Sequence, residues 1–374
     1  MNKIVISLYE TYPPASGCAN VTFNFTRYLT GKKYLFQFST KKGEETLSKD
    51  FIIKNFYLPS HKRIKKIITL IKELPGLIIE IKKIKPGYIF LEGASGAILL
   101  WYLFLYLKHS DIKIPLVYHS HNVEYELRKQ KERGIITFLS RLAERNLVNK
   151  AHLTTAVSRE DAVKFKKLYG VNPYILPNGV DIEKFENISN DEVEKIKEKY
   201  NLKGTILFFM GLTDYKPNKE AIDFLIKNIM PDIIKKYPDV KLALIGGEVN
   251  FNIEWLINPG SIPFKEVPPF IKACDICVAP IFSGSGTRLK ILEYLAAGKP
   301  VVATGKSAEG LELEKGRHFL QAETVEEFIE KLEYLLKNPE KGRKLGREGE
   351  KIVEERYSWK KIMADFNCFI EERF

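Results

Sequence analysis

Residues 278 to 303 decide the expected fold, and they read Val-Ala-Pro-Ile-Phe-Ser-Gly-Ser-Gly-Thr-Arg-Leu-Lys-Ile-Leu-Glu-Tyr-Leu-Ala-Ala-Gly-Lys-Pro-Val-Val-Ala. An apolar run ends in the Gly/Ser loop 283–286, and apolar residues then recur at helical spacing from Thr287. Gly298 is typical of a helix end, and an apolar strand follows Pro300. Strand, loop, helix and strand make up the unit of a parallel α/β sheet, so we expect such a sheet here.

The Gly/Ser loop lies where the carboxyl end of a strand meets the amino end of a helix. Free backbone N–H groups and the helix dipole favour an anion there, and Gly284 and Gly286 let a ligand approach closely. Arg288 and Lys290 add two cations to the expected first turn, which the dipole disfavours unless an anion is bound beside them. Glu293 could accept hydrogen bonds from two sugar hydroxyls. An ordinary capped surface helix is the alternative interpretation.

The basic charge is concentrated in the first half of the chain. The 374 residues suffice for two domains, and 45% hydrophobic with 28% charged residues is typical of a globular protein. Of the net charge of +12, residues 1–177 contribute 29 basic against 14 acidic residues, with peaks at 61–66 and 82–85. Such a field suits nucleic acid or an anionic membrane surface. A lysine-rich solvated face explains it equally well.

The cysteines and the amino terminus give no sign of metal binding or secretion. Cys274 and Cys277 form a CxxC by count, but the pair enters an apolar strand with no second Cys/His pair. Two small buried residues are therefore favoured over zinc or redox chemistry. The first residues, MNKIVISLYE, form a short strand without signal-peptide features. We expect a cytoplasmic protein with no cofactor and no metal site.

The first half of the chain alternates expected strands and helices. We expect strands at 4–8, 35–39, 52–58, 88–92, 115–119 and 153–157, and helices from 21 to 29, at 63–84 with an interruption at Pro75-Gly76, and at 97–107, 135–149 and 159–169. Residues 97–107 are strongly apolar but fall short of the roughly 20 residues that span a bilayer, so a buried helix is expected.

Two turns in the first half carry residues suited to chemistry. Gly17 follows the first strand, where α/β sheets bind ligands, although no GxGxxG is present. His119, His121 and Glu124 follow the strand at 115–119, and a strand end is a suitable place for acid–base groups. The spacing of the two histidines matches no zinc motif.

A Pro-Asn-Gly turn at 177–179 marks the expected junction between two domains. The alternation then restarts, with strands at 205–210 and 241–245, helices at 220–234, 267–273 and 325–337, and a last helix running from Pro339 to the end. We therefore expect an α/β fold with domains at 1–176 and 177–355, followed by the segment 356–374.

Several short motifs resemble one enzyme family when taken together. They are Pro13-Pro14 with Gly17, His121-Asn122-Val123-Glu124, Pro177-Asn178-Gly179-Val180-Asp181, Gly246, residues 273–280 (ACDICVAP) and residues 286–293 (GTRLKILE). In this order the chain resembles a GT-B glycosyltransferase of the large retaining group called family 4. The resemblance implies two Rossmann-like, doubly wound domains facing a central cleft. The acceptor enters from 1–176, the nucleotide sugar lies against 177–355, and 356–374 crosses back to the first domain.

The resemblance also implies roles for individual residues. Glu293 would bind the ribose, the amides of Ser285, Gly286 and Thr287 the diphosphate, and His121 the transferring sugar or its leaving oxygen. The full set of implied residues is Gly17, Lys216, Gly246, Ser285, Gly286, Thr287 and Glu293 for the donor, His121, Arg288 and Lys290 for catalysis, and Glu124 for the acceptor.

The sequence departs from the family pattern at four positions. Ser285 stands where the family often has a first glutamate, Leu212 and Pro217 where it has Arg and Lys, and Cys18 where it has a second glycine. Lys216, Arg288 and Lys290 supply diphosphate cations instead.

The resemblance predicts transfer of a sugar, with retention, from a nucleoside diphosphate sugar to a hydroxyl of a lipid-linked or polysaccharide glycan. The chain contains no Asp-x-Asp, which agrees with a metal-free site. One alternative is a nucleotide-sugar 2-epimerase of the same fold. Another is a non-catalytic basic protein that binds a membrane or nucleic acid. Nucleic acid is not expected, because the basic half lacks interleaved stacking aromatics. An anionic membrane surface is an expected partner, with the protein peripheral on its inner face.

Overall fold

The chain forms two compact units in the computed structural model, which describes residues 1–14, 16–59, 63–93, 97–110, 113–131, 134–251, 253–284 and 286–374, without the side chains of 63–67 and 130–131. Unit 1 comprises Met1–Asn178 together with Ile362–Phe374, and unit 2 comprises Gly179–Lys361. The boundary falls inside the expected Pro-Asn-Gly turn.

Unit 1 is built on a mostly parallel sheet with the strand order β3-β4-β2-β1-β5-β6-β7-β8. Its strands are β1 (Lys3–Ser7), β2 (Lys33–Ser39), β3 (Gly43–Ser48), β4 (Phe51–Tyr57), β5 (Tyr88–Gly93), β6 (Leu116–Ser120), β7 (Leu153–Ala156) and β8 (Tyr174–Ile175). Only β3 pairs antiparallel, with β4. The sequence did not predict β3, because its residues GEETLS are nearly all exposed and carry no apolar alternation.

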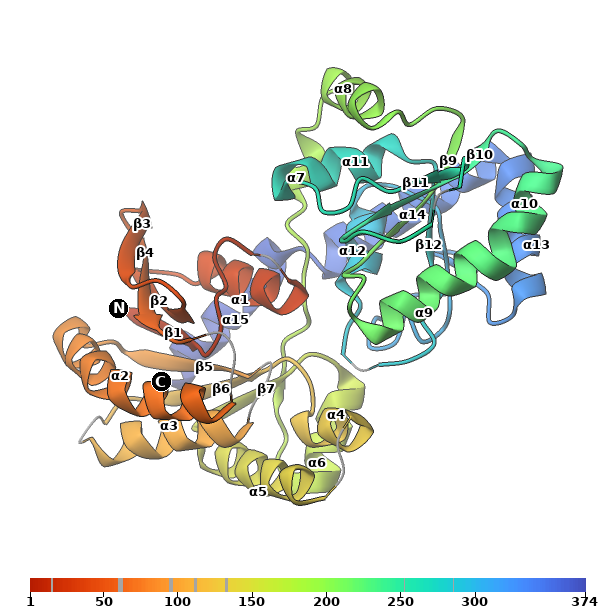
Figure 1. The fold of residues 1–374 in the computed structure, drawn as a ribbon. Helices are drawn as coiled ribbons and strands as arrows, with labels where there is room; N and C mark the ends of the chain where they lie inside the picture. The colour runs from red at the N-terminus through yellow and green to blue at the C-terminus, as the bar shows by residue number, and fades with distance from the viewer. Residues whose placement is uncertain are drawn as a thin grey trace. The chain divides into compact units, whose positions relative to one another are not determined.

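Helices cover both faces of this sheet (Figure 1). They are α1 (Gly17–Tyr28), α2 (Arg63–Ile84), α3 (Ala97–His109), α4 (Glu124–Lys131), α5 (Ile135–Lys150), α6 (Arg159–Tyr169) and α15 (Trp359–Arg373). On one face Ile4 and Phe36 share a core with buried residues of α2, α3, α5 and α6. On the other face Phe90 packs edge-on against Phe25 of α1 and contacts Phe366 of α15.

The expected interruption of α2 at Pro75-Gly76 is wrong. The helix continues through Pro75 to Ile84. Leu70, Leu74, Leu77 and Ile81, on both sides of the proline, are buried in one core. Tertiary packing of this apolar stripe therefore holds the helix together across the hydrogen bond that proline cannot make.

Unit 2 contains a wholly parallel sheet with the order β11-β10-β9-β12-β13-β14. Its strands are β9 (Thr205–Met210), β10 (Val240–Ile245), β11 (Leu256–Ile257), β12 (Ile276–Ala279), β13 (Val301–Ala303) and β14 (Leu320–Gln321). Its helices are α7 (Glu183–Glu186), α8 (Asn190–Tyr200), α9 (Lys216–Phe224), a π-helical segment (Leu225–Ile229), α10 (Met230–Lys236), a 3-10 turn (Phe264–Glu266), α11 (Val267–Ala273), α12 (Leu289–Ala296), α13 (Val325–Lys337) and α14 (Pro339–Arg356). Two cores, one on each face of the sheet, make it doubly wound.

The expected single helix from Pro339 to the end is also wrong. Helix α14 ends at Arg356, and α15 begins at Trp359. Between them the backbone pairs with Val180, whose N–H donates to Tyr357 O at 2.8 Å and whose carbonyl accepts from Trp359 N at 3.2 Å. Two backbone groups that would continue the helix are therefore used for this bridge.

In each sheet the order in which the chain adds strands reverses between two central strands. Each unit has its candidate site at this reversal. In unit 1 the chain winds outward in opposite directions from β1 and β5, and in unit 2 from β9 and β12. Loops that follow strands on either side of such a switch point diverge, leaving room for a ligand at the carboxyl ends of the strands.

The apolar helix α3 is buried on one side, as expected for Leu100, Leu103 and Leu107. Within the described ranges, none of the helices combines the length and apolarity needed to cross a bilayer. Cys274 and Cys277 are buried, as the sequence predicted.

Candidate functional site

The Gly/Ser loop joins β12 to α12 in unit 2, but the helix begins later than the sequence suggested. Helix α12 starts at Leu289, so Thr287 and Arg288 precede the first turn. The Arg288 guanidinium donates from Nη1 to Gly286 O and from Nη2 to Ser283 O at 3.2 Å. These bonds hold the loop in place of a regular helical start. Ser285 lies outside the described residues.

Arg288 is a buried cation, and no carboxylate in the described part of the chain lies at ion-pair distance from it. Its side chain is 9% exposed, and burial lowers the pKa of the guanidinium. Its Nε has no hydrogen-bond partner in the described part of the chain, and neither has the buried hydroxyl of the preceding residue, Thr287. Burying donors without acceptors costs free energy, and a ligand that accepts hydrogen bonds from them would recover it.

Lys290 is the second cation of the loop. Its Nζ donates to Asn218 Oδ1 at 2.9 Å and lies 4.0 Å from the centre of the Phe209 ring. Asn218 is in turn oriented by its bond to Leu212 O at 3.0 Å. Burial, and then the charge of Arg288, lower the pKa of Lys290 to about 7. The contacts of Lys290 with Asn218 and Phe209 are thus both uncharged. A bound anion would raise the pKa of Lys290 and favour its ammonium form.

Glu293 lies one helical turn after Lys290, on the same side of α12. The side chain is half-buried, and burial raises the pKa of its carboxyl to about 7 against the opposing effect of Lys184 and Lys290. A carboxylate beside a cation-lined loop suits the ribose hydroxyls of a nucleotide, as the resemblance implies.

Gly246 lies in a tight turn near the Gly/Ser loop, whereas Lys216 lies on an exposed helix. Gly246 follows β10 with φ +111, and a Cβ there would lie 2.5 Å from the carbonyl oxygen of Gly211. Glycine is therefore required where the ends of β9 and β10 approach. Lys216, by contrast, is exposed on α9 and lies 3.7 Å from Glu220, which accepts from the Ser283 hydroxyl at 2.7 Å. It reaches the loop only through that carboxylate.

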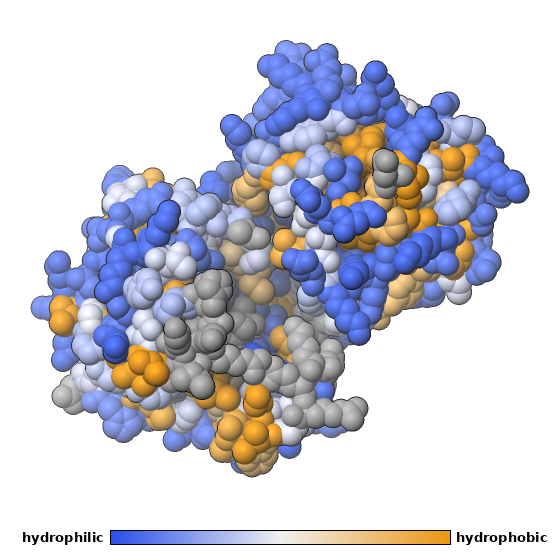
Figure 2. All heavy atoms as spheres, viewed as in Figure 1, coloured by the Kyte–Doolittle hydropathy of each residue, from blue (hydrophilic) through white to orange (hydrophobic). Residues whose placement is uncertain are grey.

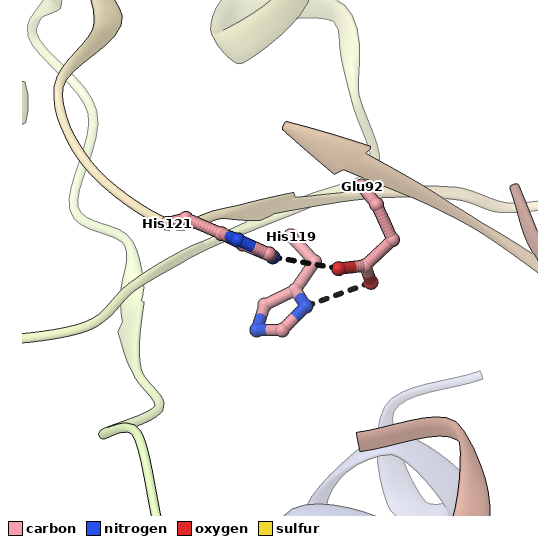
Figure 3. A group of neighbouring side chains, drawn as sticks. All are labelled: Glu92, His119 and His121. Atoms are coloured by element: carbon pink, nitrogen blue, oxygen red, sulfur yellow. Dashed lines mark hydrogen bonds and ion pairs between the residues drawn. The ribbon is translucent and has the colours of Figure 1, made fainter. Parts of the chain in front are cut away.

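In unit 1 the register of the sheet brings Glu92 and His119 side by side. The two residues are direct partners across the parallel strands β5 and β6, and Ser7 of β1 is the partner of Glu92 on the other side. His119 Nδ1 lies 2.8 Å from Glu92 Oε1, and His121 Nε2 lies 2.7 Å from Glu92 Oε2 (Figure 3). One buried carboxylate thus joins both imidazoles.

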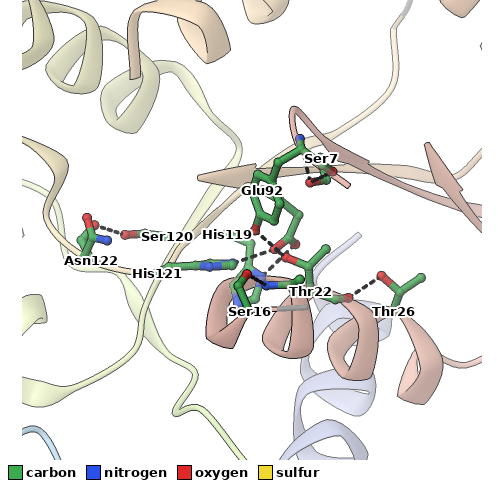
Figure 4. A network of polar contacts seen from close by, with 11 residues as sticks. Ser7, Ser16, Thr22, Thr26, Glu92, His119, Ser120, His121 and Asn122 are labelled. Carbon is green, nitrogen blue, oxygen red and sulfur yellow. Dashed lines mark hydrogen bonds and ion pairs between the residues drawn. The ribbon is translucent and has the colours of Figure 1, made fainter. Parts of the chain in front are cut away.

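Helix α1 closes this cluster with polar and aromatic groups (Figure 4). The Thr22 hydroxyl donates to Glu92 Oε2 at 2.8 Å and also bonds the Tyr9 hydroxyl at 2.9 Å. The Phe25 ring stacks on the His119 ring with 4.2 Å between centroids. Glu92, His119 and His121 are consequently at most 5% exposed.

The electrostatics of the cluster favour a carboxylate and an imidazolium. Burial alone would raise the pKa of Glu92, but His119 and His121 lower it to about 2. Burial alone would lower the pKa of His121, but Cys18 and Glu92 raise it to about 9. These interactions therefore favour the imidazolium form of His121. No described residue accepts a hydrogen bond of ordinary geometry from its Nδ1, although the Cys18 side chain lies close enough to raise the pKa of the imidazole.

The same three residues are the group that could hold a metal ion, since one ligand atom from each lies within 4.8 Å of the others. However, the N···O separations of 2.7 and 2.8 Å are hydrogen-bond lengths and imply a proton between each pair. A zinc ion would require both nitrogens facing Glu92 to be deprotonated. The observed geometry fits protons better.

Glu124 and Gly17 each begin a helix beside this part of unit 1, α4 and α1 respectively. Glu124 is the first residue of α4 and accepts from Arg128 Nε at 2.7 Å, so the carboxylate that joins the histidines is Glu92 instead. Sequence reasoning missed Glu92 because it ends a different strand. Gly17 is the exposed first residue of α1, directly after the capping Ser16.

Comparisons with known proteins now identify the family. A family described as "Glycosyl transferases group 1" matches residues 204–338, and one described as "Glycosyltransferase Family 4" matches residues 15–184. The chain belongs to the family 4 glycosyltransferases of the GT-B fold. The resemblance and the fold class inferred from the sequence are thereby confirmed.

This glycosyltransferase is similar in sequence to some known proteins and in fold to others, in both cases at low sequence identity. An uncharacterised glycosyltransferase of Methanocaldococcus jannaschii is 24% identical over 289 residues, which cover 73% of this chain and 71% of the relative. The phosphatidyl-myo-inositol mannosyltransferase of Propionibacterium freudenreichii is 25% identical over 173 residues, 46% of this chain and 43% of that protein. Sucrose-phosphate synthase of Thermosynechococcus elongatus superimposes with a TM-score of 0.80 at 15% identity, covering 100% of this chain and 98% of that one. Anabaena HepE, solved with UDP-glucose, gives 0.73 at 15% identity and covers both chains fully.

Proposed function

We propose that this glycosyltransferase moves a hexose from a nucleoside diphosphate sugar to a hydroxyl acceptor, with retention at the anomeric carbon and without a metal ion. The donor diphosphate lies against the loop 283–288 and α12 of unit 2. The support from relatives is the solved HepE structure, which holds UDP-glucose in the same fold.

The observation that carries this proposal is the pair of uncompensated cations. Within the described residues, neither Arg288 nor Lys290 has a carboxylate at ion-pair distance, and burial lowers the pKa of both. A buried cation without a partner is costly, so the charged forms of Arg288 and Lys290 favour a bound anion. A diphosphate supplies two negative groups, and the free Arg288 Nε and Thr287 hydroxyl supply donors for its oxygens.

In the proposed step the bond between the anomeric carbon and the diphosphate oxygen breaks. The acceptor oxygen bonds to that carbon on the same face, and its proton passes to the departing phosphate oxygen. Arg288 and Lys290 stabilise the charge that develops on the diphosphate. No enzymic nucleophile is required, and Gly286 leaves the backbone amides of the loop open to the phosphates.

His121 and Glu293 position the two ends of the donor in this proposal. The Nδ1–H of the protonated His121 donates to the transferring sugar or its leaving oxygen. The Glu293 carboxylate accepts from the ribose hydroxyls. Gly17, Gly246 and Lys216 remain predicted donor contacts, and Glu124 a predicted acceptor contact.

The acceptor is proposed to be a glycan that is lipid-linked or part of a polysaccharide. Support comes from the phosphatidyl-myo-inositol mannosyltransferases, whose name describes transfer to a lipid-linked polyol. A lipid acceptor also suits the basic charge of residues 1–177.

The test is isothermal titration calorimetry with UDP, GDP, ADP and TDP, in EDTA and in Mg2+, on the wild type and on Arg288→Gln. We expect one nucleotide to bind equally in both buffers and the variant to lose most of the affinity. Binding that requires Mg2+ would contradict the metal-free mechanism, and no binding of any nucleotide would contradict the donor site. Incubation of the matching nucleotide sugar without acceptor then separates transfer from epimerisation, since only an epimerase converts it.

A further inference from the structure

Helix α5 of unit 1 exposes large apolar side chains and buries several polar ones. Its buried positions include Thr137, Ser140 and Glu144, whereas Ile135 is 73% exposed and Phe138 is 64% exposed. An ordinary surface helix has the opposite arrangement, with the apolar stripe inward. The first two turns of α5 therefore present large apolar side chains to the surroundings.

The exposed apolar surface extends along α5 and onto its neighbour α3. Ile136, Leu139 and Leu142 of α5 are 37%, 41% and 46% exposed. Helix α3 packs against α5 and exposes Ile98 and Tyr102. Figure 2 shows apolar residues gathered on the part of unit 1 where Figure 1 places α5. We call this set of residues on α3 and α5 the apolar surface.

All the exposed charges on these two helices are positive at neutral pH. Lys108, Arg141, Arg145 and Lys150 are exposed, while the single carboxylate of the two helices, Glu144, is buried beneath α4. Glu144 accepts from the backbone N–H groups of Glu124 and Tyr125 at 2.8 and 2.9 Å and from the Tyr169 hydroxyl. It therefore does not neutralise the outer face.

This pairing of apolar and basic side chains selects one kind of partner. A second copy of the chain would bring the same cations face to face, which is unfavourable. An anionic phospholipid bilayer accepts aromatic and aliphatic side chains at the acyl boundary and attracts cations at the headgroups. None of the described helices is suited to span the bilayer, so contact would be confined to its surface.

We propose that unit 1 docks on anionic phospholipid membranes through the apolar surface of α3 and α5, with Phe138 and Leu142 inserted and Arg141 and Arg145 at the headgroups. The sequence-based expectation of a membrane partner depended only on the net basic charge of residues 1–177 and named no surface. The proposed docking does not depend on the donor site, because the residues involved belong to unit 1 and the proposed diphosphate site to unit 2.

The test is co-sedimentation of the full chain with vesicles of phosphatidylcholine, alone or mixed with phosphatidylglycerol, at low and high salt. We expect binding to the mixed vesicles, weakened by salt and by omission of phosphatidylglycerol. Phe138→Ser/Leu142→Ser should lower the affinity about tenfold or more. The matched control is Phe264→Ser/Tyr334→Ser, which changes two side chains of unit 2 that are 42% and 44% exposed, and it should bind like the wild type.

A second variant separates the electrostatic contribution from the apolar one. Arg141→Gln/Arg145→Gln should lower affinity for the mixed vesicles about tenfold and reduce the salt dependence, because each cation near an anionic surface contributes separately. Circular dichroism and nucleotide binding should remain those of the wild type in both variants, which distinguishes loss of docking from loss of fold or of the donor site.

Three results would overturn the proposal. The first is no binding of the wild type to mixed vesicles at low salt. The second is equal binding by the Phe138→Ser/Leu142→Ser variant and its control. The third is a dimer in sedimentation velocity that this variant dissociates, since the apolar surface would then be covered by a second copy of the chain.

Discussion

The two candidate sites differ in whether their buried charges have charged partners within the fold. In unit 1 the carboxylate of Glu92 is surrounded by two imidazoles and a hydroxyl, so the charges compensate one another within the fold. In unit 2 Arg288 and Lys290 are held by carbonyls, an amide oxygen and an aromatic ring, none of which carries a full charge. The charges of the first cluster balance within the fold, although His119 Nε2 and His121 Nδ1 have no partner among the described residues. The cations of the second cluster have no carboxylate at ion-pair distance in that part of the chain, so an anion would complete it.

This difference explains what each cluster contributes. A compensated buried cluster stabilises the fold and fixes the orientation and protonation of His121. An uncompensated one costs stability, and that cost is recovered when the ligand binds. Variants of the two clusters should therefore differ in the sign of their effect on the unliganded protein.

The largest expected effect is that of Glu92→Gln. Removing the carboxylate leaves a buried imidazolium without its partner, which should lower the free energy of unfolding by about 3 kcal/mol. Thermal denaturation should show a melting temperature several degrees lower, and the pH profile of turnover should shift as the pKa of His121 falls.

The matched control for Glu92→Gln is Glu194→Gln, which alters a 63% exposed carboxylate paired with Lys197 at 2.9 Å. It should leave the melting temperature unchanged. Equal melting temperatures for Glu92→Gln and the wild type would show that the cluster is not a compensated pair.

Next in size is the effect of Lys290→Met on nucleotide binding. Loss of the charge should weaken nucleoside diphosphate binding about hundredfold, or about 2.7 kcal/mol. The melting temperature of the unliganded variant should nevertheless rise, because an uncompensated cation has been replaced by an apolar side chain of similar length. Titration calorimetry and thermal denaturation measure the two effects on the same sample.

The control for Lys290→Met is Lys227→Met, at an exposed lysine 3.2 Å from Asp223. Neither quantity should change in it. A lower melting temperature in unliganded Lys290→Met would mean that Lys290 stabilises the fold rather than awaiting a ligand.

The compensated cluster should also give unfolding a defined pH dependence. Glu92 has its pKa lowered from 4.5 to about 2, so its contribution is present above pH 4.5 and is lost as the pH falls toward 2. His121 has its pKa raised from 6.5 to about 9, so its contribution is present below pH 6.5 and is lost as the pH rises through 9. We expect about 2 kcal/mol less stability at pH 9 than at pH 6.5. Urea denaturation across this range should show a smaller change in Glu92→Gln, and an identical change in both proteins would argue against the assignment to His121.

The smallest expected effect is that of Glu293→Gln on nucleotide binding by unit 2. Glu293→Gln should weaken nucleoside diphosphate binding about tenfold, because two hydrogen bonds to a carboxylate become bonds to a neutral amide. Inorganic pyrophosphate, which has no ribose, should bind the variant as it binds the wild type. Competition titrations with both ligands measure this, and equal losses for the two would place Glu293 at the phosphates instead.

Local patterns in the sequence predicted much of the second unit. The order of strand, Gly/Ser loop, helix and strand from Val278 to Ala303 is present, and Gly246 lies at a turn that excludes a side chain. The start of α12 was placed too early, because the hydrogen bonds from Arg288 to its own loop compete with the helical start. The donor contacts assigned by resemblance stay predictions.

In unit 1 the sequence indicated the histidines but not their partner. Glu92 is separated from His119 by a whole helix and meets it only through the register of β5 and β6. Helix α5 was expected from its periodicity, yet which of its sides is covered depends on how it packs against α3 and α4.

The sequence by itself determined the α/β alternation, the family, the Gly/Ser loop with its cations, and the uneven distribution of charge, since all of these depend on residues that are near one another in the chain. Only the tertiary structure decided that Glu92 joins two histidines, that no described carboxylate lies at ion-pair distance from Arg288 or Lys290, and that the apolar side of α5 faces outward. These properties depend on strand register and helix packing, in which distant segments compete for the same contacts, and no local pattern encodes the outcome.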